Sequence, residues 1–345
     1  MTSSTASTTG LESTGLSDIS LPLPDRRDGK VRVSYEWSPT ERLFVTTDRL
    51  SAFDRIIATV PHKGQVLNQL AAWWFERTRG IVANHLVSVP DPNVTIGRTA
   101  YPLPVEVVVR GYITGVTSTS LWRQYVDGAR TIYGYDFPDG LTKNTALPNA
   151  IVTPTTKAET GGHDEPITCA DVVSKRLIEE TTWMRVCDRA LRLFAEGQRV
   201  ASAAGLILAD TKYEFGLAAD DGDLLLIDEV HTPDSSRYWM ADSYAARLES
   251  GDEPESLDKE VVRRALIDLG YDGNGVPPVL PPDVVAATTD RYISAYERIT
   301  GCSFERAATP AARRIERAIA TLVATTSAAT ATTTISPTAT AEDQA

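Results

Sequence analysis

Three charged residues stand at every second position of one short stretch: Asp210, Lys212 and Glu214. If this stretch is a β-strand, alternate side chains lie on the same face of the sheet, so the three charges share one face. Tyr213 and Phe215 then point to the other face, where aromatic side chains anchor a strand in the core. A lysine between two carboxylates is typical of a charged site and also of a solvated ladder of salt bridges, so this stretch alone leaves both interpretations open.

A second candidate strand, Leu224–Ile227, is too apolar for a solvated edge and runs directly into Asp228 and Glu229. Carboxylates at the end of a buried strand need a partner. Magnesium is held in proteins by one or two carboxylates together with ligand phosphates. Glu214 and Asp228, facing each other across a hairpin, are therefore candidate metal ligands. A pair of surface acids is the alternative.

The turn of this hairpin decides whether the two acids meet. A two-residue turn at Asp221–Gly222 would pair Glu214 with Glu229, whereas a three-residue loop with Gly222 in the left-handed conformation and a bulge would pair Glu214 with Asp228. Paired carboxylates repel unless a cation lies between them. A metal site at these acids therefore requires the second register or a longer loop of the same parity.

A loop rich in hydroxyl groups follows, from Thr232 to Trp239, and it contains one arginine, Arg237. A planar guanidinium suits bidentate capture of a phosphate or a carboxylate. A capped helix start is the simpler interpretation. The position of the loop just beyond Asp228 favours an anion site.

Weaker patterns lie elsewhere. Gly29 and Lys30 form a Gly-Lys step without the pattern of a Walker loop. Thr153–Lys157 and His163–Glu165 are expected in loops, where functional residues concentrate. Three other histidines lack the spacing of metal ligands and are predicted to be packing or surface residues: His62, His85 and His231.

Composition limits the class of protein. With 345 residues and 42% hydrophobic content the chain can bury a large core. The net charge of −12 argues against a general binder of nucleic acids or membrane surfaces, so an anionic ligand must meet a local cationic pocket. The three scattered cysteines suggest neither disulfides nor zinc. Neither a signal peptide nor a stretch of ~20 apolar residues is visible, which predicts a cytoplasmic protein.

The patterning predicts an α+β chain. Expected strands are 29–36, Leu43–Thr47 and Pro104–Arg110, the last followed by a turn at 111–115, and a hairpin of Leu206–Phe215 with Leu224–Val230. Expected helices are Val66–Arg77, Cys169–Ala204, 258–269, 281–299 and the short Ala311–Val323. The predicted organisation is a disordered arm (1–20), an N-terminal lobe (21–112), a C-terminal lobe (113–305) and an extension ending in an Ala/Thr-rich tail (306–345).

Together these segments resemble the phosphoribosylaminoimidazole-succinocarboxamide synthase (SAICAR synthetase) family from about Gly29 to Gly301. The motifs that carry the resemblance are Gly29–Arg32, Thr47–Asp54, Lys63–Leu67, Val109–Gly115, Thr153–Lys157, His163–Glu165, Ala209–Gly216 and Asp228–Trp239. The resemblance implies a two-lobed α+β fold built on antiparallel sheets, with ATP in the cleft between the lobes. It also implies ligation of the carboxylate of carboxyaminoimidazole ribonucleotide (CAIR) to L-aspartate through an acyl phosphate, giving SAICAR, ADP and phosphate.

The resemblance further implies roles for individual residues. Lys212, Asp210 and Arg237 are the expected catalytic residues. ATP is expected at Gly29, Lys30, Val31, Lys212 and the backbone near Glu106 and Val108, and magnesium at Glu214 and Asp228. Substrate binding is expected at Lys63, Arg110, Gly115, Ser118, Lys157, Asp234, Ser236 and Arg237, with Asp54 in support. The segment after Gly115 is longer than is usual in the family, so the choice among the hydroxyls of residues 117–120 stays open.

Three alternatives remain from the sequence. A paralogue in specialised metabolism could amidate another azole ribonucleotide carboxylate. A phosphotransferase acting on a hydroxyl group would be expected to carry a kinase-type H-R-D loop, and none is present. A non-catalytic nucleotide-binding regulator should have lost metal acids or cationic substrate residues, and this chain keeps them.

Overall fold

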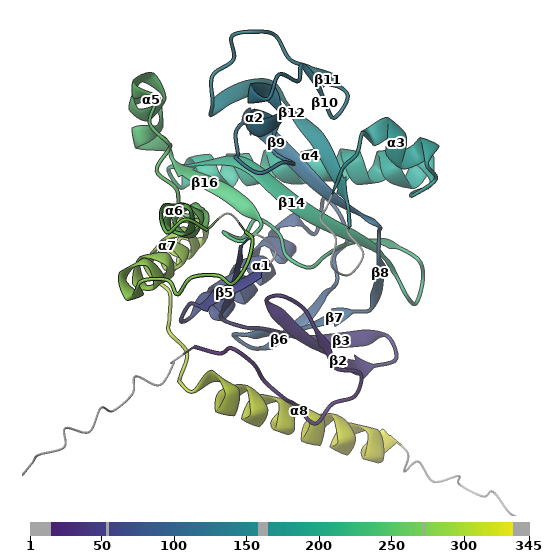
Figure 1. Cartoon of the computed structure of the whole chain (residues 1–345). Helices are drawn as coiled ribbons and strands as arrows, with labels where there is room; N and C mark the ends of the chain where they lie inside the picture. The colour runs from purple at the N-terminus through teal and green to yellow at the C-terminus, as the bar shows by residue number, and fades with distance from the viewer. Residues whose placement is uncertain (1–14, 53–54, 158–164, 272, 334–345) are drawn as a thin grey trace, which may run out of the picture.

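The computed structural model describes residues 15–52, 55–157, 165–271 and 273–333. Helices and antiparallel sheets make up this part of the chain, which confirms the α+β class (Figure 1). The smaller main sheet has the strand order β1-β2-β3-β7-β6. Its strands are β1 (Arg27–Asp28), β2 (Arg32–Ser38), β3 (Glu41–Thr46), β6 (Leu86–Asp91) and β7 (Val94–Arg98).

The larger sheet has the order β13-β12-β9-β14-β15, and β16 and β8 also pair with β14. Its strands are β8 (Ala100–Pro102), β9 (Val105–Ile113), β12 (Thr145–Thr156), β13 (Glu165–Pro166), β14 (Leu206–Ala218), β15 (Leu224–Ile227) and β16 (Ser236–Met240). Two short hairpins complete the strands: β4 (Arg49–Ala52) with β5 (Arg55–Thr59), and β10 (Thr131–Ile132) with β11 (Tyr135–Asp136). Strand β14 therefore joins more strands than any other element of this sheet.

Strand β9 is longer than predicted. It continues past Arg110 to Ile113, which is fully buried and pairs with Thr145 on β12. The turn predicted at 111–115 is therefore wrong for its first three residues, and the division predicted at residue 112 falls inside this strand. The loop predicted at Thr153–Lys157 is wrong as well, because β12 pairs with β9 as far as residue 156.

Both registers considered for the β14–β15 hairpin are wrong. Glu214 pairs with Ile227, one residue short of Asp228. The connection is longer than a tight turn: the backbone N–H of Gly222 donates to the carbonyl oxygen of Ala218 at 3.0 Å, and the strands pair only beyond this loop. Because Asp228 has a left-handed backbone (φ 66°), β15 ends just before it.

The described part of the chain contains these helices: α1 (Lys63–Thr78), α2 (Leu121–Val126), α3 (Cys169–Ser174), α4 (Glu180–Ala203), α5 (Ala241–Ser250), α6 (Glu260–Asp268), α7 (Pro282–Thr300) and α8 (Ala311–Thr333). The helix predicted over 169–204 is two helices, because Arg176 adopts a left-handed backbone (φ 56°). The carboxylate of Glu179 then accepts a hydrogen bond from the backbone of Thr182 and caps the start of α4. Helix α5 was not predicted.

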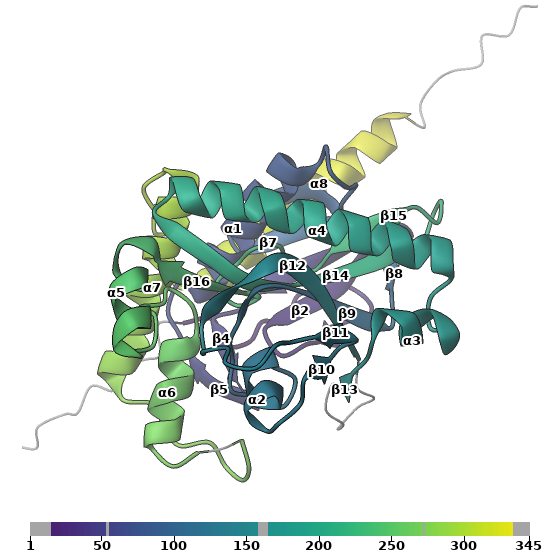
Figure 2. The ribbon, with the colours of Figure 1, turned by 90° about the horizontal axis from the view of Figure 1, so that it is seen from above.

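One face of the larger sheet is apolar and covered by helices. Helix α4 runs across it (Figure 2), and Trp183 and Phe194 of this helix share a core with Trp74 of α1 and with Val107 and Tyr213 of the sheet. All five side chains are at most 3% exposed. The opposite face of β14 is left for the charged residues.

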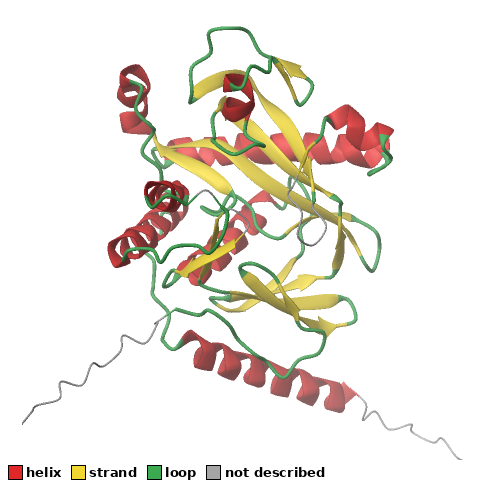
Figure 3. Cartoon of the chain, viewed as in Figure 1, coloured by secondary structure: helices red, strands yellow, loops and turns green. Residues whose placement is uncertain are grey.

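The two ends of the described chain pack on the smaller sheet. Leu16 and Ile19 are both 4% exposed and share a core with Val33 of β2, with Ile315 and Ile319 of α8 completing it. The disordered arm predicted for residues 1–20 is therefore wrong for residues 15–20. The predicted short helix is also longer than expected, because α8 reaches residue 333; Figure 3 shows it alongside the smaller sheet.

None of the helices in the described ranges combines the length and apolar character that a bilayer crossing needs.

Among the described residues, two histidines are buried in the core. His85 packs between the rings of Phe44 and Phe75, and Nε2 of His231 bonds to the hydroxyl of Tyr213. Burial lowers the pKa of each imidazole to about 3. Both side chains are therefore neutral packing residues at neutral pH, as the sequence predicted.

The C-terminal helix should contribute directly to stability. We expect Ile315→Ala to lower the free energy of unfolding by about 2–5 kcal/mol, since the side chain is fully buried. Val323→Ala on the same helix is the control, because Val323 is 40% exposed and should change stability by less than ~0.5 kcal/mol. Urea denaturation measures both. Equal effects of the two substitutions would contradict the packing of α8.

The buried histidines should also make stability depend on pH. In the unfolded chain an imidazole has a pKa of about 6.5, so below this pH the unfolded state takes up a proton that native His85 does not. Between pH 7.5 and 5.5, wild type should therefore lose ~1 kcal/mol more of its free energy of unfolding than His85→Phe, whose ring does not titrate. Urea denaturation at both pH values tests this. Equal losses would mean that His85 is protonated in the folded protein.

Candidate active site

The site is built on the charged face of β14. Asp210, Lys212 and Glu214 share this face, and Tyr213 and Phe215 on the other side are fully buried. The alternation predicted from the sequence is therefore confirmed. At about 3.3 Å per residue, the charged positions span roughly 13 Å along the strand. This spacing gives room for two neighbouring groups of side chains.

The first group surrounds Lys212. Its Nζ donates to Glu106 and to Glu214, each at 2.7 Å, and Lys157 donates to the other oxygen of Glu214 at 2.5 Å. Burial would raise the pKa of Glu214, but the ammonium groups of Lys212 and Lys157 outweigh it and lower this pKa to about 2. Burial likewise acts to lower the pKa of Lys212, and Glu214 and Glu106 raise it well above its ordinary value. Lys212 and Glu214 are therefore both charged at neutral pH.

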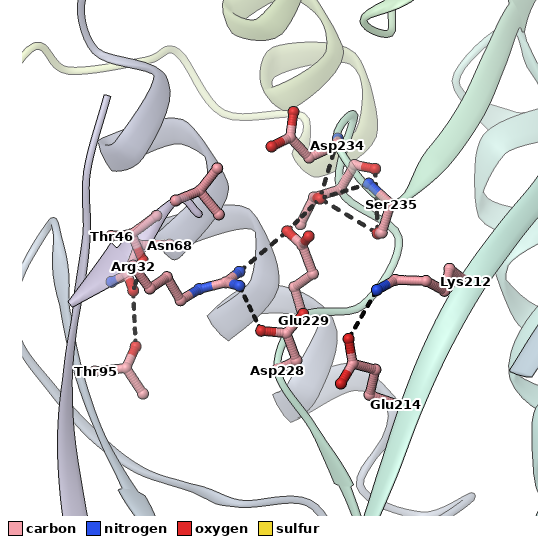
Figure 4. Close-up of polar contacts among 12 residues, drawn as sticks. Arg32, Thr46, Asn68, Thr95, Lys212, Glu214, Asp228, Glu229, Asp234 and Ser235 are labelled. Carbon is pink, nitrogen blue, oxygen red and sulfur yellow. Dashed lines mark hydrogen bonds and ion pairs between the residues drawn. The ribbon is translucent and has the colours of Figure 1, made fainter. Parts of the chain in front are cut away.

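An arginine from the smaller sheet reaches the acids after β15. Nη1 of Arg32 bonds to Asp228, and its Nη2 lies 3.2 Å from Glu229, whose carboxylate also accepts a hydrogen bond from Thr232 at 2.6 Å. Figure 4 shows Asp228 and Glu229 lying between Arg32 on one side and Lys212 with Glu214 on the other. The left-handed backbone at Asp228 turns the chain out of the strand. The two candidate metal acids thus lie near each other although the predicted register is wrong.

Asp228 differs from Glu214 in its electrostatics. Burial raises the pKa of Asp228 to about 6; Arg32 opposes this rise, and the nearby carboxylates of Glu214 and Glu229 add to it. The acids predicted to repel each other are therefore held near each other, with a guanidinium on Asp228 and two ammonium groups on Glu214.

The second group surrounds Asp210. Arg110 stands directly across from it on β9 and contacts it at 3.4 Å, and Arg237 on β16 bonds to the same carboxylate oxygen. Arg110 also donates to the hydroxyl of Thr153 at 2.8 Å. A Cβ added to Gly115 would lie 3.7 Å from Arg237 and only 2.5 Å from Ser120, so only glycine fits beside this pair of guanidinium groups. This arrangement suits an anionic ligand.

A third, closed group lies beside the loop after β15. Nζ of Lys63, at the start of α1, donates to Asp234 at 2.7 Å, and the hydroxyl of Tyr292 donates to the other oxygen of Asp234 at 2.5 Å. Lys63 is completely buried and Asp234 is 4% exposed. Lys63 lowers the pKa of Asp234 against the opposing effect of burial. This pair ties α1 and α7 to the loop.

Other predicted residues are placed as follows. Gly29–Val31 form a turn in which the N–H of Gly29 donates to Arg32, while the hydroxyl of Thr47 donates to Val31. Val108 lies in a central strand and pairs with Thr153 on one side and Lys212 on the other. The sheet therefore uses the hydrogen-bonding groups of its backbone, which leaves none at Val108 for the predicted contact with adenine.

The two serines predicted to bind substrate, Ser118 and Ser236, differ in their surroundings. Ser118 is exposed, and Ser236 shares a 2.8 Å hydrogen bond with Thr211. Asp54, His163 and Asp164 lie outside the described residues.

The described residues hold no group of three or more His, Cys, Asp or Glu side chains arranged for a metal. Glu214 and Asp228 can therefore supply only part of a coordination shell. This donor set fits magnesium, which takes one or two carboxylates and completes its shell with water and ligand phosphates.

Two hollows in the described part of the chain are lined by residues outside β14. A cavity of about 20 Å³ is lined in part by Arg32 and Asp228 and has room for about one water molecule. A wider hollow of about 610 Å³ lies between α1 and β6, and none of the predicted site residues lines it.

Sequence reasoning missed Arg32, Glu229 and Tyr292 as members of the site. The carboxylate of Glu106, for which no role was predicted, accepts a hydrogen bond from Lys212. Arg32 was part of a quoted motif, and its place two residues after Lys30 was an available signal. Nothing in the sequence pointed to Tyr292.

Comparison with known proteins gives concordant results. The profile of the SAICAR synthetase family matches residues 25–278. The chain is 49% identical over 290 residues to the phosphoribosylaminoimidazole-succinocarboxamide synthase of Legionella pneumophila (strain Lens), covering 84% of this chain and 92% of the relative. It is 52% identical over 253 residues to the chloroplastic enzyme of the same name from Vigna aconitifolia, covering 73% of each chain.

A solved structure agrees with these relatives. The SAICAR synthase from Saccharomyces cerevisiae complexed with SAICAR superposes with a TM-score of 0.69 and 34% sequence identity. The match covers 87% of this chain and 99% of that one.

The buried pair of Lys63 and Asp234 gives a direct test of the site's construction. Lys63→Met leaves a buried carboxylate without its counter-charge and should lower the free energy of unfolding by about 3–5 kcal/mol. Lys63→Met combined with Asp234→Asn should recover at least half of this loss, because a neutral amide needs no counter-charge. Urea denaturation measures both variants. If the double variant were as unstable as the single one, the ion pair would not be the cause.

Proposed function

Since this chain belongs to the SAICAR synthetase family, we propose that its cleft joins the carboxylate of CAIR to the amine of L-aspartate at the expense of ATP. The products are SAICAR, ADP and phosphate, and the reaction is a step of purine biosynthesis. The three small-molecule substrates are its partners. The proposed compartment is the cytoplasm, in keeping with three free cysteines, although the name of the Vigna relative places that enzyme in the chloroplast.

A carboxylate is a poor electrophile, so the proposed path has two steps. An oxygen of the CAIR carboxylate attacks the γ-phosphorus of ATP; ADP leaves and an acyl phosphate forms. The amine nitrogen of aspartate then attacks the carbonyl carbon, the C–O bond to phosphate breaks and the nitrogen loses a proton. Side chains contribute mainly by orienting the reactants and stabilising charge.

The nucleotide is assigned to the group around Lys212. The turn at Gly29–Val31 covers the phosphates, and the ammonium group of Lys212 neutralises the transferred phosphoryl group. Glu214 and Asp228 would hold magnesium, which would supply charge neutralisation at the phosphate oxygens. Lys157, on the far oxygen of Glu214, keeps that acid ionised.

The ribonucleotide is assigned to the group around Asp210. Arg110 and Arg237 present guanidinium groups to its phosphate and carboxylate, with Ser236 and the Gly115 turn beside them. Asp210 fixes the direction of both guanidinium groups because it bonds to each. Lys63 supports this arrangement indirectly, since it holds Asp234 in the loop that leads to Ser236.

One observation carries the proposal: a single strand face places a lysine with metal-type acids next to an acid clamped by two arginines. Transfer of a phosphoryl group to a bound carboxylate needs both groups of side chains side by side. The spacing of roughly 13 Å along the strand between Asp210 and Glu214 places the two groups of side chains next to each other.

The test is ADP release with CAIR and L-aspartate, compared with other azole ribonucleotide carboxylates and other amines. Arg237→Lys should raise the KM for CAIR at least tenfold more than the KM for ATP, because a point charge replaces a planar fork. Arg123→Lys, at an exposed arginine on α2, is the control and should behave as wild type. Equal rises in both KM values would mean that Arg237 does not bind the ribonucleotide specifically. Turnover with a different azole alone would overturn the proposed substrate.

A further inference from the structure

Each acid of the proposed metal site already has a cationic partner from the protein. Lys212 and Lys157 bond to Glu214, one to each carboxylate oxygen. Arg32 bonds to Asp228 and lies 3.2 Å from Glu229. An arginine cannot lose its proton at physiological pH, so Arg32 is a permanent positive charge at this place.

Arg32 and its acids come from different sheets. Arg32 is the first residue of β2 in the smaller sheet, and Asp228 and Glu229 follow β15 of the larger sheet. The side chain of Arg32 is only 16% exposed and that of Glu229 only 8%. Figure 4 shows the guanidinium approaching both acids from the side opposite Lys212. Buried charges of this kind strongly need partners, so neither side can lose the other without a replacement.

A divalent cation at Asp228 would compete with this guanidinium. It needs a carboxylate oxygen of Asp228 as ligand, and the two positive charges would repel each other at close range. The backbone of Arg32 accepts a hydrogen bond from Gly29 at 2.8 Å and so closes the turn assigned to the ATP phosphates. A guanidinium leaving Asp228 would therefore have polyphosphate oxygens within reach as its new partners.

We propose that Arg32 is a placeholder cation, which neutralises Asp228 and Glu229 before metal and nucleotide bind and transfers to the nucleotide phosphates when the metal takes Asp228. The inference rests on the proposed function, because it takes Glu214 and Asp228 as the metal acids. It makes metal binding and nucleotide binding depend on one side chain in opposite ways.

The sign of one measurement separates this role from simple support of Asp228. If Arg32 competes with the metal, Arg32→Gln should bind Mn²⁺ alone at least ~10-fold more tightly than wild type and have a KM for ATP at least ~10-fold higher. If Arg32 only positioned Asp228, the same variant would bind Mn²⁺ more weakly. Mn²⁺ binding is measured by electron paramagnetic resonance without nucleotide.

Arg49→Gln is the matched control. Arg49 lies beside the same turn, and its substitution removes one positive charge, as Arg32→Gln does. Its guanidinium bonds to the backbone oxygens of Gly29 and Arg32 and to the hydroxyl of Thr47, and not to Asp228 or Glu229. Its Mn²⁺ affinity should stay within about twofold of wild type. An equal gain in both variants would show a general charge effect and overturn the placeholder role.

A second measurement needs no variant. In a crystal of wild type with Mn²⁺ and a non-hydrolysable ATP analogue, Arg32 should have parted from Asp228 and should contact the polyphosphate. A metal on Asp228 with the Arg32 contact intact would overturn the inference alone. If wild type bound no Mn²⁺ at Glu214 and Asp228 even with the ATP analogue, the proposed metal acids would fail and the placeholder role with them.

Discussion

Burial of Tyr213 and Phe215 beneath β14 fixes the direction of every charged side chain on the other face of that strand. Their rings cannot turn outward without opening the core that they share with α1 and α4. Packing of the core therefore orients Asp210, Lys212 and Glu214. Contacts among these three side chains are not needed to place them on one face. The partners of these side chains come from β9, from β16 and from the residue that follows β12; β9 and β16 pair directly with β14, and β12 pairs with β9.

The candidate site is held together by charges that come from distant parts of the chain. Arg32 and Asp228 are 196 residues apart, and Lys63 and Asp234 are 171 apart. Buried ion pairs contribute little net stability when intact, yet losing one partner is costly. The site therefore depends on the correct packing of both sheets and both helices, α1 and α7. The overall negative charge of the chain does not exclude cations from the site, because lysines and arginines face its carboxylates where these elements meet.

Local patterns in the sequence were sufficient to predict much of the candidate site. Period-two alternation predicted the charged face of β14, and the apolar run before Asp228 predicted a buried strand beside it. The register was missed because it depends on a loop whose hydrogen bonds, such as Gly222 to Ala218, leave no signal in residue type. Arg32 was missed because its partners are remote in sequence. Leu16 and Ile19 were taken for part of a mobile arm because two apolar residues in a polar stretch show no period, and only the sheet beneath them provides a place for their burial.

The position of α8 has a consequence for how the chain folds during its synthesis. The smaller sheet is complete by residue 98, yet Ile315 and Ile319, which cover part of its outer face, are made more than 200 residues later. At 5–20 residues per second, the ribosome needs about 10–40 s to reach them. For that time the exposed apolar face can bind other nascent chains or chaperones. Leu16, Ile19 and Leu21, which emerge first, already cover part of this face. The segment at the start of the chain thus covers part of this face before α8 has been synthesised.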